Sequence, residues 1–244
     1  MTAATSATAL RVLAQLRRDP RTIALLVAVP CMLIFLVDQL FADRPQVFQH
    51  VGVPLLGLFP LVSMFLVTSI TMLRERTSGT LERLLSMPLT KLDLLGGYGI
   101  AFAGVAIVQA TIVSLVGFGL LDLTVVNTKA LVVALAVANA VLGMSLGLFL
   151  SAFARTEFQA VQFMPAFILP QILLCGLLVP REQMAEWLQW ISAVMPFTYA
   201  YDALARAASE PDLGARFWLD VAVTVGVTLL ALALGAATLR RRTP

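Results

Sequence analysis

Few residues of this chain combine the type and the spacing that a chemical reaction needs. Gly143-Met144-Ser145-Leu146-Gly147 matches the G-x-S-x-G pattern, in which the serine acts as a nucleophile. That pattern requires a turn between a strand and a helix, whereas these residues lie inside a long charge-free run. The single histidine, His50, belongs to a distant segment. We therefore interpret the match as a coincidence.

Phosphate and metal chemistry lack their usual signatures as well. A phosphate-binding loop needs a Gly-Lys-Ser/Thr sequence, and the chain has no Gly-Lys dipeptide: its lysines, Lys91 and Lys129, each follow a threonine. Cys31 and Cys175 form no CxxC pair and no cluster with metal-ligand spacing. We expect no catalytic residue, no metal and no cofactor in this chain, and no ATP hydrolysis by it.

The composition indicates a membrane protein. Of the residues, 59% are hydrophobic and 13% are charged, and the mean hydropathy is +0.91, whereas a soluble domain carries about 25% charged residues. The net charge of +3 would suit nucleic acid, but the basic residues flank long apolar runs, which favours a membrane. We therefore expect contact with lipid and none with nucleic acid.

Six runs are long and apolar enough to cross a bilayer of about 30 Å. We predict an all-α membrane protein with a single transmembrane domain over 1–244. The expected spans are 22–40, 51–73, 94–121, 130–154, 158–180 and 219–239. The runs themselves carry almost no ionisable residue, which argues against a proton-driven carrier.

The distribution of basic residues predicts the orientation. With the N-terminus inside, 12 of the 17 Lys and Arg residues fall in inner segments. The outer ones are Arg44, Lys129, Arg181, Arg206 and Arg216. Positive residues favour the cytoplasmic side, so both termini are expected there.

Two connecting segments have the pattern of amphipathic helices. In the inner segment, expected as a helix over 75–90, Leu81, Leu84, Leu85 and Pro88 fall on one helical face. In the outer segment, expected as helices over 181–208, Met184, Trp187, Leu188 and Ile191 do the same before the break at Pro196. From the pattern alone, each helix could simply rest on lipid.

These two segments resemble the ABC-2 type transporter membrane proteins, particularly the drug-export and nodulation-factor-export branch. The inner match comprises Arg74, Glu75, Gly79, Thr80, Leu81, Glu82, Leu85, Pro88 and Leu89. The outer match comprises Pro196, Thr198, Tyr199, Ala200, Asp202, Ala203 and Leu204, with Met195 where the family often has asparagine and an arginine displaced to position 206.

The resemblance implies the permease subunit of an ABC exporter in a bacterial cytoplasmic membrane. The inner helix would be a coupling helix that contacts a separate ATPase, which would hold the ATP and Mg²⁺. Its contact residues would be Arg74, Glu75, Arg76, Gly79, Thr80, Leu81, Glu82, Leu84, Leu85 and Pro88. The outer segment would form a re-entrant element around Pro196, Thr198, Tyr199 and Asp202. A second copy or a paralogous permease would complete the membrane half.

Residues inside the runs suggest a path and a packing face. A weakly polar path for an amphipathic, lipid-like or drug-like cargo would involve Gln159, Gln162, Phe163, Phe167 and Gln171, although ordinary interhelical hydrogen bonding explains the glutamines equally well. Asn139, Gly143, Gly147 and Ser151 form a small-residue stripe suited to helix packing. A carrier driven by an ion gradient and a membrane scaffold without transport remain alternatives.

Overall fold

The structure is a computed structural model of the chain, and it describes residues 3–80 and 90–238. All regular secondary structure within these residues is helical, so the predicted all-α class is confirmed for them. The elements are α1 (Ala3–Arg17), α2 (Pro20–Leu40), α3 (Pro45–Thr77), α5 (Lys91–Gly119), α6 (Lys129–Leu150), α7 (Glu157–Phe163), the π-helix η1 (Met164–Ile168), α8 (Leu169–Leu174), the 3-10 helix η2 (Arg181–Gln183), α9 (Glu186–Val194), α10 (Pro196–Ser209) and α11 (Ala215–Thr238).

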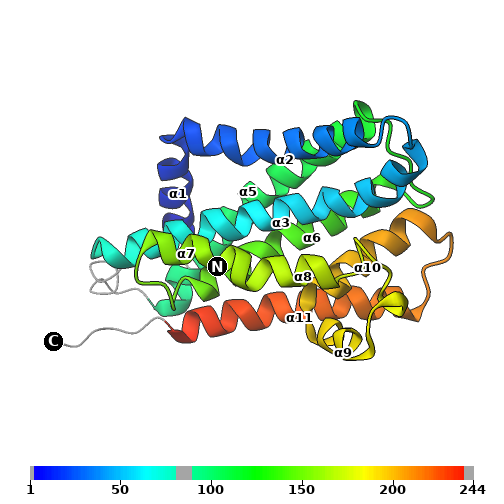
Figure 1. Cartoon of the computed structure of the whole chain (residues 1–244). Helices are drawn as coiled ribbons and strands as arrows, with labels where there is room; N and C mark the ends of the chain where they lie inside the picture. The colour runs from blue at the N-terminus through cyan, green and yellow to red at the C-terminus, as the bar shows by residue number, and fades with distance from the viewer. Residues whose placement is uncertain (1–2, 81–89, 239–244) are drawn as a thin grey trace.

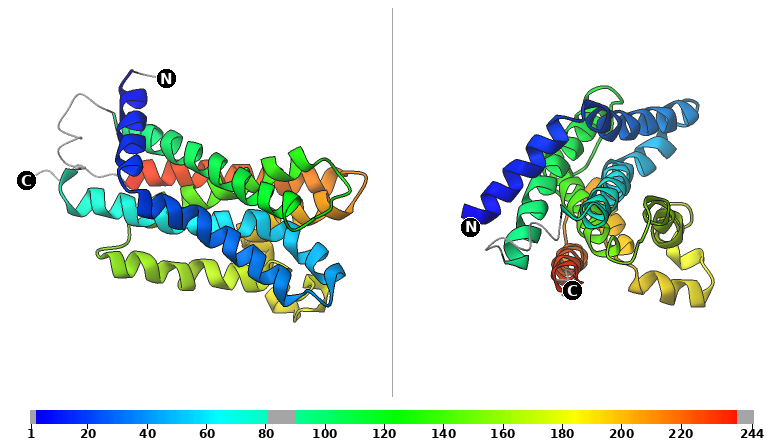
Figure 2. Two further views of the ribbon diagram at one scale, coloured as in Figure 1. Left: turned by 90° about the horizontal axis from the view of Figure 1, so that it is seen from above. Right: turned by 90° about the vertical axis from the view of Figure 1, so that its left-hand side faces the viewer.

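Five of these helices are long and apolar enough to cross a membrane: α2, α3, α5, α6 and α11. They lie side by side as a bundle, and α1 runs across one end of it (Figures 1 and 2). We call this the α1 end; the opposite end carries α9 and α10, and we call it the α10 end (Figure 1).

The fifth predicted run, 158–180, is not one continuous α-helix. It forms α7, η1 and α8 in succession, and the helical part ends at Leu174. Pro165 lies in the π-helix and Pro170 in α8; because proline lacks the N–H that an α-helix needs, the hydrogen-bond pattern changes here. A sixth span therefore stays a prediction.

The centre of the bundle is the contact between α3 and α6. A Cβ added to Gly143 would lie 2.0 Å from the backbone oxygen of Leu61, and one added to Gly147 would lie 2.4 Å from that of Phe65. The hydroxyl of Thr68 donates to Met144 O at 3.2 Å across the same contact. The two backbones are this close because the glycines have no side chain there.

A corner at Asp19 and Pro20 turns the chain from α1 into α2. Asp19 caps α2 by accepting hydrogen bonds from the backbone N–H of Thr22 at 3.2 Å and from its hydroxyl at 2.6 Å. Pro20 occupies the first helical turn, where no N–H is needed. α1 was not predicted from the sequence, although its buried residues Thr5, Ala9 and Val12 follow a helical spacing.

Candidate functional site

The α1 end holds the beginning of the predicted inner helix. α3 continues to Thr77, so Glu75 and Arg76, which were expected to open that helix, are part of α3. Basic residues in a last helical turn lie at the negative end of the helix dipole, which favours this extension of α3. Gly79 then turns the chain with a φ of +72°, a conformation that favours glycine.

Most of the predicted coupling helix lies outside the described residues. Thr80 is helical, but Leu81, Glu82, Leu84, Leu85 and Pro88 all fall in the undescribed range 81–89. The chain resumes at Thr90, which caps α5 in a reciprocal pair of hydrogen bonds with Asp93. The described residues therefore place both ends of this segment at the α1 end.

Arg74 forms an ion pair across the surface of the bundle. Its Nε lies 2.8 Å from Glu157 Oε1 and its Nη2 lies 3.0 Å from Glu157 Oε2, so the guanidinium holds both carboxylate oxygens. Both side chains are more than half exposed, so this contact stabilises the fold by at most about 1 kcal/mol. It joins the end of α3 to the beginning of α7.

Glu75 is buried, unlike its neighbour Arg74. Its side chain is 4% exposed, and its Oε1 lies 3.5 Å from Nη1 of Arg11 on α1. Arg11 also donates a hydrogen bond to the hydroxyl of Tyr98 on α5 and lies against the Tyr98 ring. These three side chains tie α1, α3 and α5 together, although no sequence pattern marks Arg11 or Tyr98.

Close packing and a side-chain hydrogen bond hold α1 against α5 as well. A Cβ added to Gly97 would lie 2.5 Å from Cβ of Thr8, so α1 fits because this position is glycine. Thr5 donates a hydrogen bond to Asp93 at 2.9 Å. The helix that lies across the α1 end is thereby fixed to the first turns of α5, directly after the undescribed segment.

At the α10 end, the outer motif residues join α9 to α10. Thr198 donates to Ser192 O at 2.7 Å, and the Tyr199 hydroxyl donates to Ala193 O at 2.6 Å. Pro196 occupies the first turn of α10, where its fixed φ suits a helix start. These three motif residues therefore fix the break between the two helices.

Buried ion pairs extend from α10 in two directions. Asp202 binds Nη2 of Arg181 at 2.6 Å, and Arg206 Nε lies 3.3 Å from the fully buried carboxylate of Asp220 on α11. Burial raises the pKa of Asp202 to about 6, although the guanidinium of Arg181 acts in the opposite direction. The pairs hold α10 against η2 and α11.

The residues predicted to line a path lie on α7, η1 and α8. Gln162 and Phe167 are exposed, and Phe163 is half-buried against the core. Gln171 of α8 donates to Phe167 O of η1 at 2.8 Å, one turn earlier. Gln159 instead accepts a hydrogen bond from the N–H of Arg155 at 2.8 Å. Gln162 and Phe167 therefore share an exposed surface, whereas the side chain of Gln159, also in α7, is bound to the turn before that helix.

The stripe on α6 lies against α3 and α10. Gly143 and Gly147 contact the α3 backbone, and Asn139 donates to Ala200 O of α10 at 3.2 Å. The buried hydroxyl of Ser151 donates to Leu148 O at 2.6 Å. Ser145, the serine of the G-x-S-x-G match, is buried inside α6 and donates to Leu142 O at 2.8 Å. It therefore does not lie at the strand-to-helix turn that a nucleophilic serine of this motif requires.

Comparison with known proteins places these features in a family context. The family model described as ABC-2 type transporter matches residues 4–207. The probable multidrug ABC transporter permease YbhR of Escherichia coli (strain K12) is 33% identical over 147 residues, which are 59% of this chain and 40% of that protein.

Two further relatives are similar over a comparable stretch. The inner membrane transport permease YhhJ of Escherichia coli (strain K12) is 29% identical over 58% of this chain and 38% of its own length. ABC transporter G family member 20 of Dictyostelium discoideum is 28% identical over 57% of this chain and 19% of its own length. The matches thus span less than half the length of each relative.

Proposed function

Because this chain belongs to the ABC-2 type transporter family, we propose that it is the permease subunit of an exporter driven by a separate ATPase. The observation that carries the proposal is the family match over residues 4–207, on a chain with five helices suited to crossing a membrane. The sequence has no Gly-Lys dipeptide and hence no phosphate-binding loop, so ATP and Mg²⁺ bind the partner ATPase.

The ATPase docks at the α1 end, on the segment between α3 and α5. Two features support this position. Arg74 and Arg76 end α3 at this point, and the segment returns to the bundle at the Thr90 cap of α5. Glu82 and Leu85 of that segment are the contact residues that we propose to test. With both termini cytoplasmic, this end faces the cytoplasm of a bacterial cell.

A second membrane subunit packs on the face formed by α7, η1 and α8. Phe158 and Phe167 are 70% and 49% exposed there, and Gln162 is exposed between them. An amide exposed to hydrocarbon has no hydrogen-bond partner, so this face is better covered by protein or by a water-filled path. The second subunit is another copy of this chain or a paralogous permease.

The cargo is an amphipathic, lipid-like or drug-like molecule. The name of YbhR describes that protein as a probable multidrug permease, and this chain is 33% identical to it over the matched region. Aromatic rings and amides on the α7–η1–α8 face supply contacts for a molecule with both apolar and polar parts.

The decisive experiment uses the chain together with a candidate partner ATPase that carries a phosphate-binding loop. We expect the ATPase to co-purify with the wild-type chain, and we expect the pair to export a lipophilic dye from vesicles when ATP is present. A variant ATPase without its phosphate-loop lysine should abolish export. Export that persists without ATP hydrolysis would favour a carrier driven by an ion gradient, and absence of both export and ATPase binding would favour a scaffold.

Two substitutions test the docking segment itself. Glu82→Ala removes a carboxylate, and losing one partner of a desolvated charged contact costs about 2–5 kcal/mol. Leu85→Asp places a charge on the apolar face. Both should reduce co-purification of the ATPase at unchanged abundance in the membrane, whereas Glu182→Ala, at the α10 end, should leave it unchanged. Normal ATPase binding and export for both variants would exclude this segment as the coupling element.

A further inference from the structure

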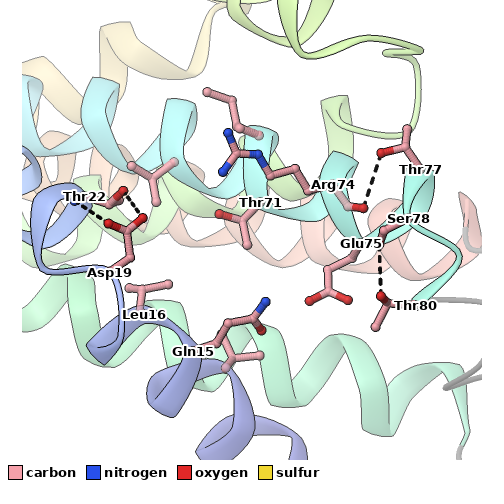
Figure 3. A pocket seen from close by; sticks show the side chains of 13 residues that line it. Gln15, Leu16, Asp19, Thr22, Thr71, Arg74, Glu75, Thr77, Ser78 and Thr80 are labelled. Atoms are coloured by element: carbon pink, nitrogen blue, oxygen red, sulfur yellow. Dashed lines mark hydrogen bonds between the residues drawn. The ribbon is translucent and has the colours of Figure 1, made fainter.

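A cavity of about 620 Å³ opens at the α1 end, between the α1–α2 corner and the last turns of α3 (Figure 3). Its wall includes Thr77, Ser78 and Thr80, so the cavity borders the start of the docking segment between α3 and α5. Its wall is apolar along Leu16, Val67 and Ile70, and polar at Asp19, Thr71 and Glu75. A cavity of this size holds a drug-sized molecule or a lipid headgroup with part of its chain.

The strongest chemical feature of the cavity is the carboxylate of Glu75. It points away from α3 into the space between α3 and α1 (Figure 3). Its side chain is 4% exposed; Oε1 pairs with Arg11, and Oε2 has no hydrogen-bond partner among the described residues. An ionised oxygen buried without a donor is costly, and a ligand with an N–H group would supply the missing donor.

The charges around the cavity favour a cation. The charged side chains of the wall are Asp19, Arg74 and Glu75. Their ion-pair partners are Glu157, which holds Arg74, and Arg11, which holds Glu75. Three carboxylates thus face two guanidinium groups, which leaves one negative charge for a ligand to neutralise.

We propose that this cavity binds the ammonium group of a cationic amphiphile, with the ammonium at Glu75 and Asp19 and the apolar body along Leu16, Val67 and Ile70. The ammonium donates to Oε2 of Glu75, which the Arg11 pair leaves free. Asp19 lies on the exposed side of the wall and adds a second negative charge. The proposal concerns binding and does not require that the bound molecule is exported.

The same chemistry has two sources in a membrane. One is a free lipophilic amine, and the other is the ethanolammonium headgroup of a phospholipid. Both offer an N–H donor, a positive charge and an apolar chain, and both concentrate at a membrane surface. The experiment below distinguishes them by changing the lipid.

The test measures binding to the whole purified chain in phosphatidylcholine nanodiscs. The probe is dansylcadaverine, which carries a fluorophore and a primary ammonium, and its control is N-pentyl dansylamide, which lacks the ammonium. Empty nanodiscs report partition into lipid alone. We expect saturable binding of the cation and binding of the neutral control that is at least about tenfold weaker, the factor expected for one charged hydrogen bond.

Four variants locate the site. Glu75→Gln should weaken binding of dansylcadaverine about tenfold or more. Asp19→Asn should weaken it less and should preserve the fold, because asparagine caps a helix as well as aspartate does. Thr71→Trp should block the cavity without changing a charge. Glu182→Gln, an exposed carboxylate at the α10 end, should bind like the wild type.

Phosphatidylethanolamine added to the nanodiscs identifies the source. Weaker apparent binding of the probe to the wild type would show that the lipid headgroup occupies the cavity, and unchanged binding would assign the cavity to free amines. The proposal is overturned if the folded Asp19→Asn and Thr71→Trp variants both bind like the wild type, or if the neutral control binds as tightly as the cation. No ATPase is present in this assay, so its failure would leave the proposed export function untouched.

Discussion

Single ion pairs join the helices at both ends of the bundle. Arg11 and Glu75 link α1 to α3, Arg181 and Asp202 link η2 to α10, and Arg206 reaches Asp220 on α11. In each pair the carboxylate is mostly or fully buried, so losing the guanidinium removes a partner from a buried charge. Removing the guanidinium should therefore lower the free energy of unfolding by more than the ion pair contributes to it.

Replacing Arg11 by glutamine tests this at the α1 end. The substitution leaves the Glu75 carboxylate without its cation and the Tyr98 hydroxyl without its donor, at a cost of about 2 kcal/mol. We expect a lower midpoint of thermal unfolding in detergent. Arg17→Gln, an exposed arginine of the same helix, should leave the midpoint unchanged. Equal midpoints for the Arg11→Gln and Arg17→Gln variants would contradict the prediction.

The Asp202 carboxyl should give the unfolding equilibrium a pH dependence. Its pKa is about 6 in the folded chain against 3.8 in its ordinary range, so the folded chain binds the proton first as the pH falls. The contribution of this group to the free energy of unfolding therefore increases by about 1 kcal/mol as the pH falls from about 7.5 to 5. The same contribution is lost as the pH rises through about 6.

The measurement is the free energy of unfolding of the wild type and of Asp202→Asn across this pH range. Only the wild type should show the increase, because the amide does not titrate. Asp212→Asn, an exposed aspartate in the next loop, should behave like the wild type. An Asp202→Asn variant with the full wild-type pH dependence would show that another group titrates.

Helices α3 and α6 pack with their backbones close together, and this contact limits the size of the side chain that position 143 can hold. A methyl group at Gly143 would lie 2.0 Å from a backbone oxygen, which cannot rotate away as a side chain would. Gly143→Ala should therefore destabilise the fold by about 1–3 kcal/mol through overpacking. Gly104→Ala on α5, where an added Cβ meets nothing within 4 Å, should be neutral or slightly stabilising.

Thermal unfolding in detergent and the yield of folded protein would compare these two alanine variants. Both changes add the same methyl group to a helical glycine, so helix propensity alone predicts that they behave alike. The expected difference is the effect of the contact with Leu61. Equal stability of the two variants would show that α6 can shift away from α3 without loss.

The sequence predicts the elements whose patterns are local. The runs of α2, α3, α5, α6 and α11 are long and carry almost no charge, so their positions follow from hydropathy alone. Their ends do not: α3 extends past 73 to Thr77 because its arginines lie at the helix end rather than beyond it. α1 was missed because its buried residues include Thr5 and Thr8, whose burial depends on α5 rather than on their own polarity.

The parts of the candidate site that depend on a local pattern were predictable from the sequence as well. The outer motif marks a helix start at Pro196, and the structure gives Thr198 and Tyr199 their hydrogen bonds to α9. No local pattern connects Arg11 to Glu75 or to Tyr98, because these residues meet only when three helices pack. The sequence likewise groups Gln159 with Gln162, and both lie in α7, but the Gln159 side chain accepts a hydrogen bond from the N–H of Arg155 in the preceding turn.

On the scale of the whole molecule, the two ends of the bundle should face opposite sides of the membrane. In a chain with Cys31 and Cys175 replaced, a cysteine at exposed Arg17 marks the α1 end and one at exposed Glu182 marks the α10 end. We expect a membrane-impermeant maleimide to label Glu182→Cys in intact cells and Arg17→Cys only after permeabilisation. Labelling in the reverse pattern would invert the proposed topology.

The proposed subunit contact makes a second prediction at this scale. Val161 on α7 and Val225 on α11 are 44% and 46% exposed, but only Val161 lies on the α7–η1–α8 face. In the same cysteine-free background, Val161→Cys should form a covalent dimer with a bismaleimide, or a product with a paralogous permease, and Val225→Cys should not. Crosslinking at Val225 alone would move the interface to α11.

The pairing of α3 with α6 also has a consequence for how the protein is made. Thr68 and its partner Met144 are 76 positions apart in the chain. At about 5–20 residues per second, the ribosome needs roughly 4–15 s to add the residues between them. Throughout that interval the face of α3 that carries Leu61, Phe65 and Thr68 lies in the bilayer without its partner helix. Leu61 and Phe65 are apolar and the Thr68 hydroxyl also donates to Met64 O of its own helix at 2.7 Å, so α3 tolerates lipid on this face until α6 emerges.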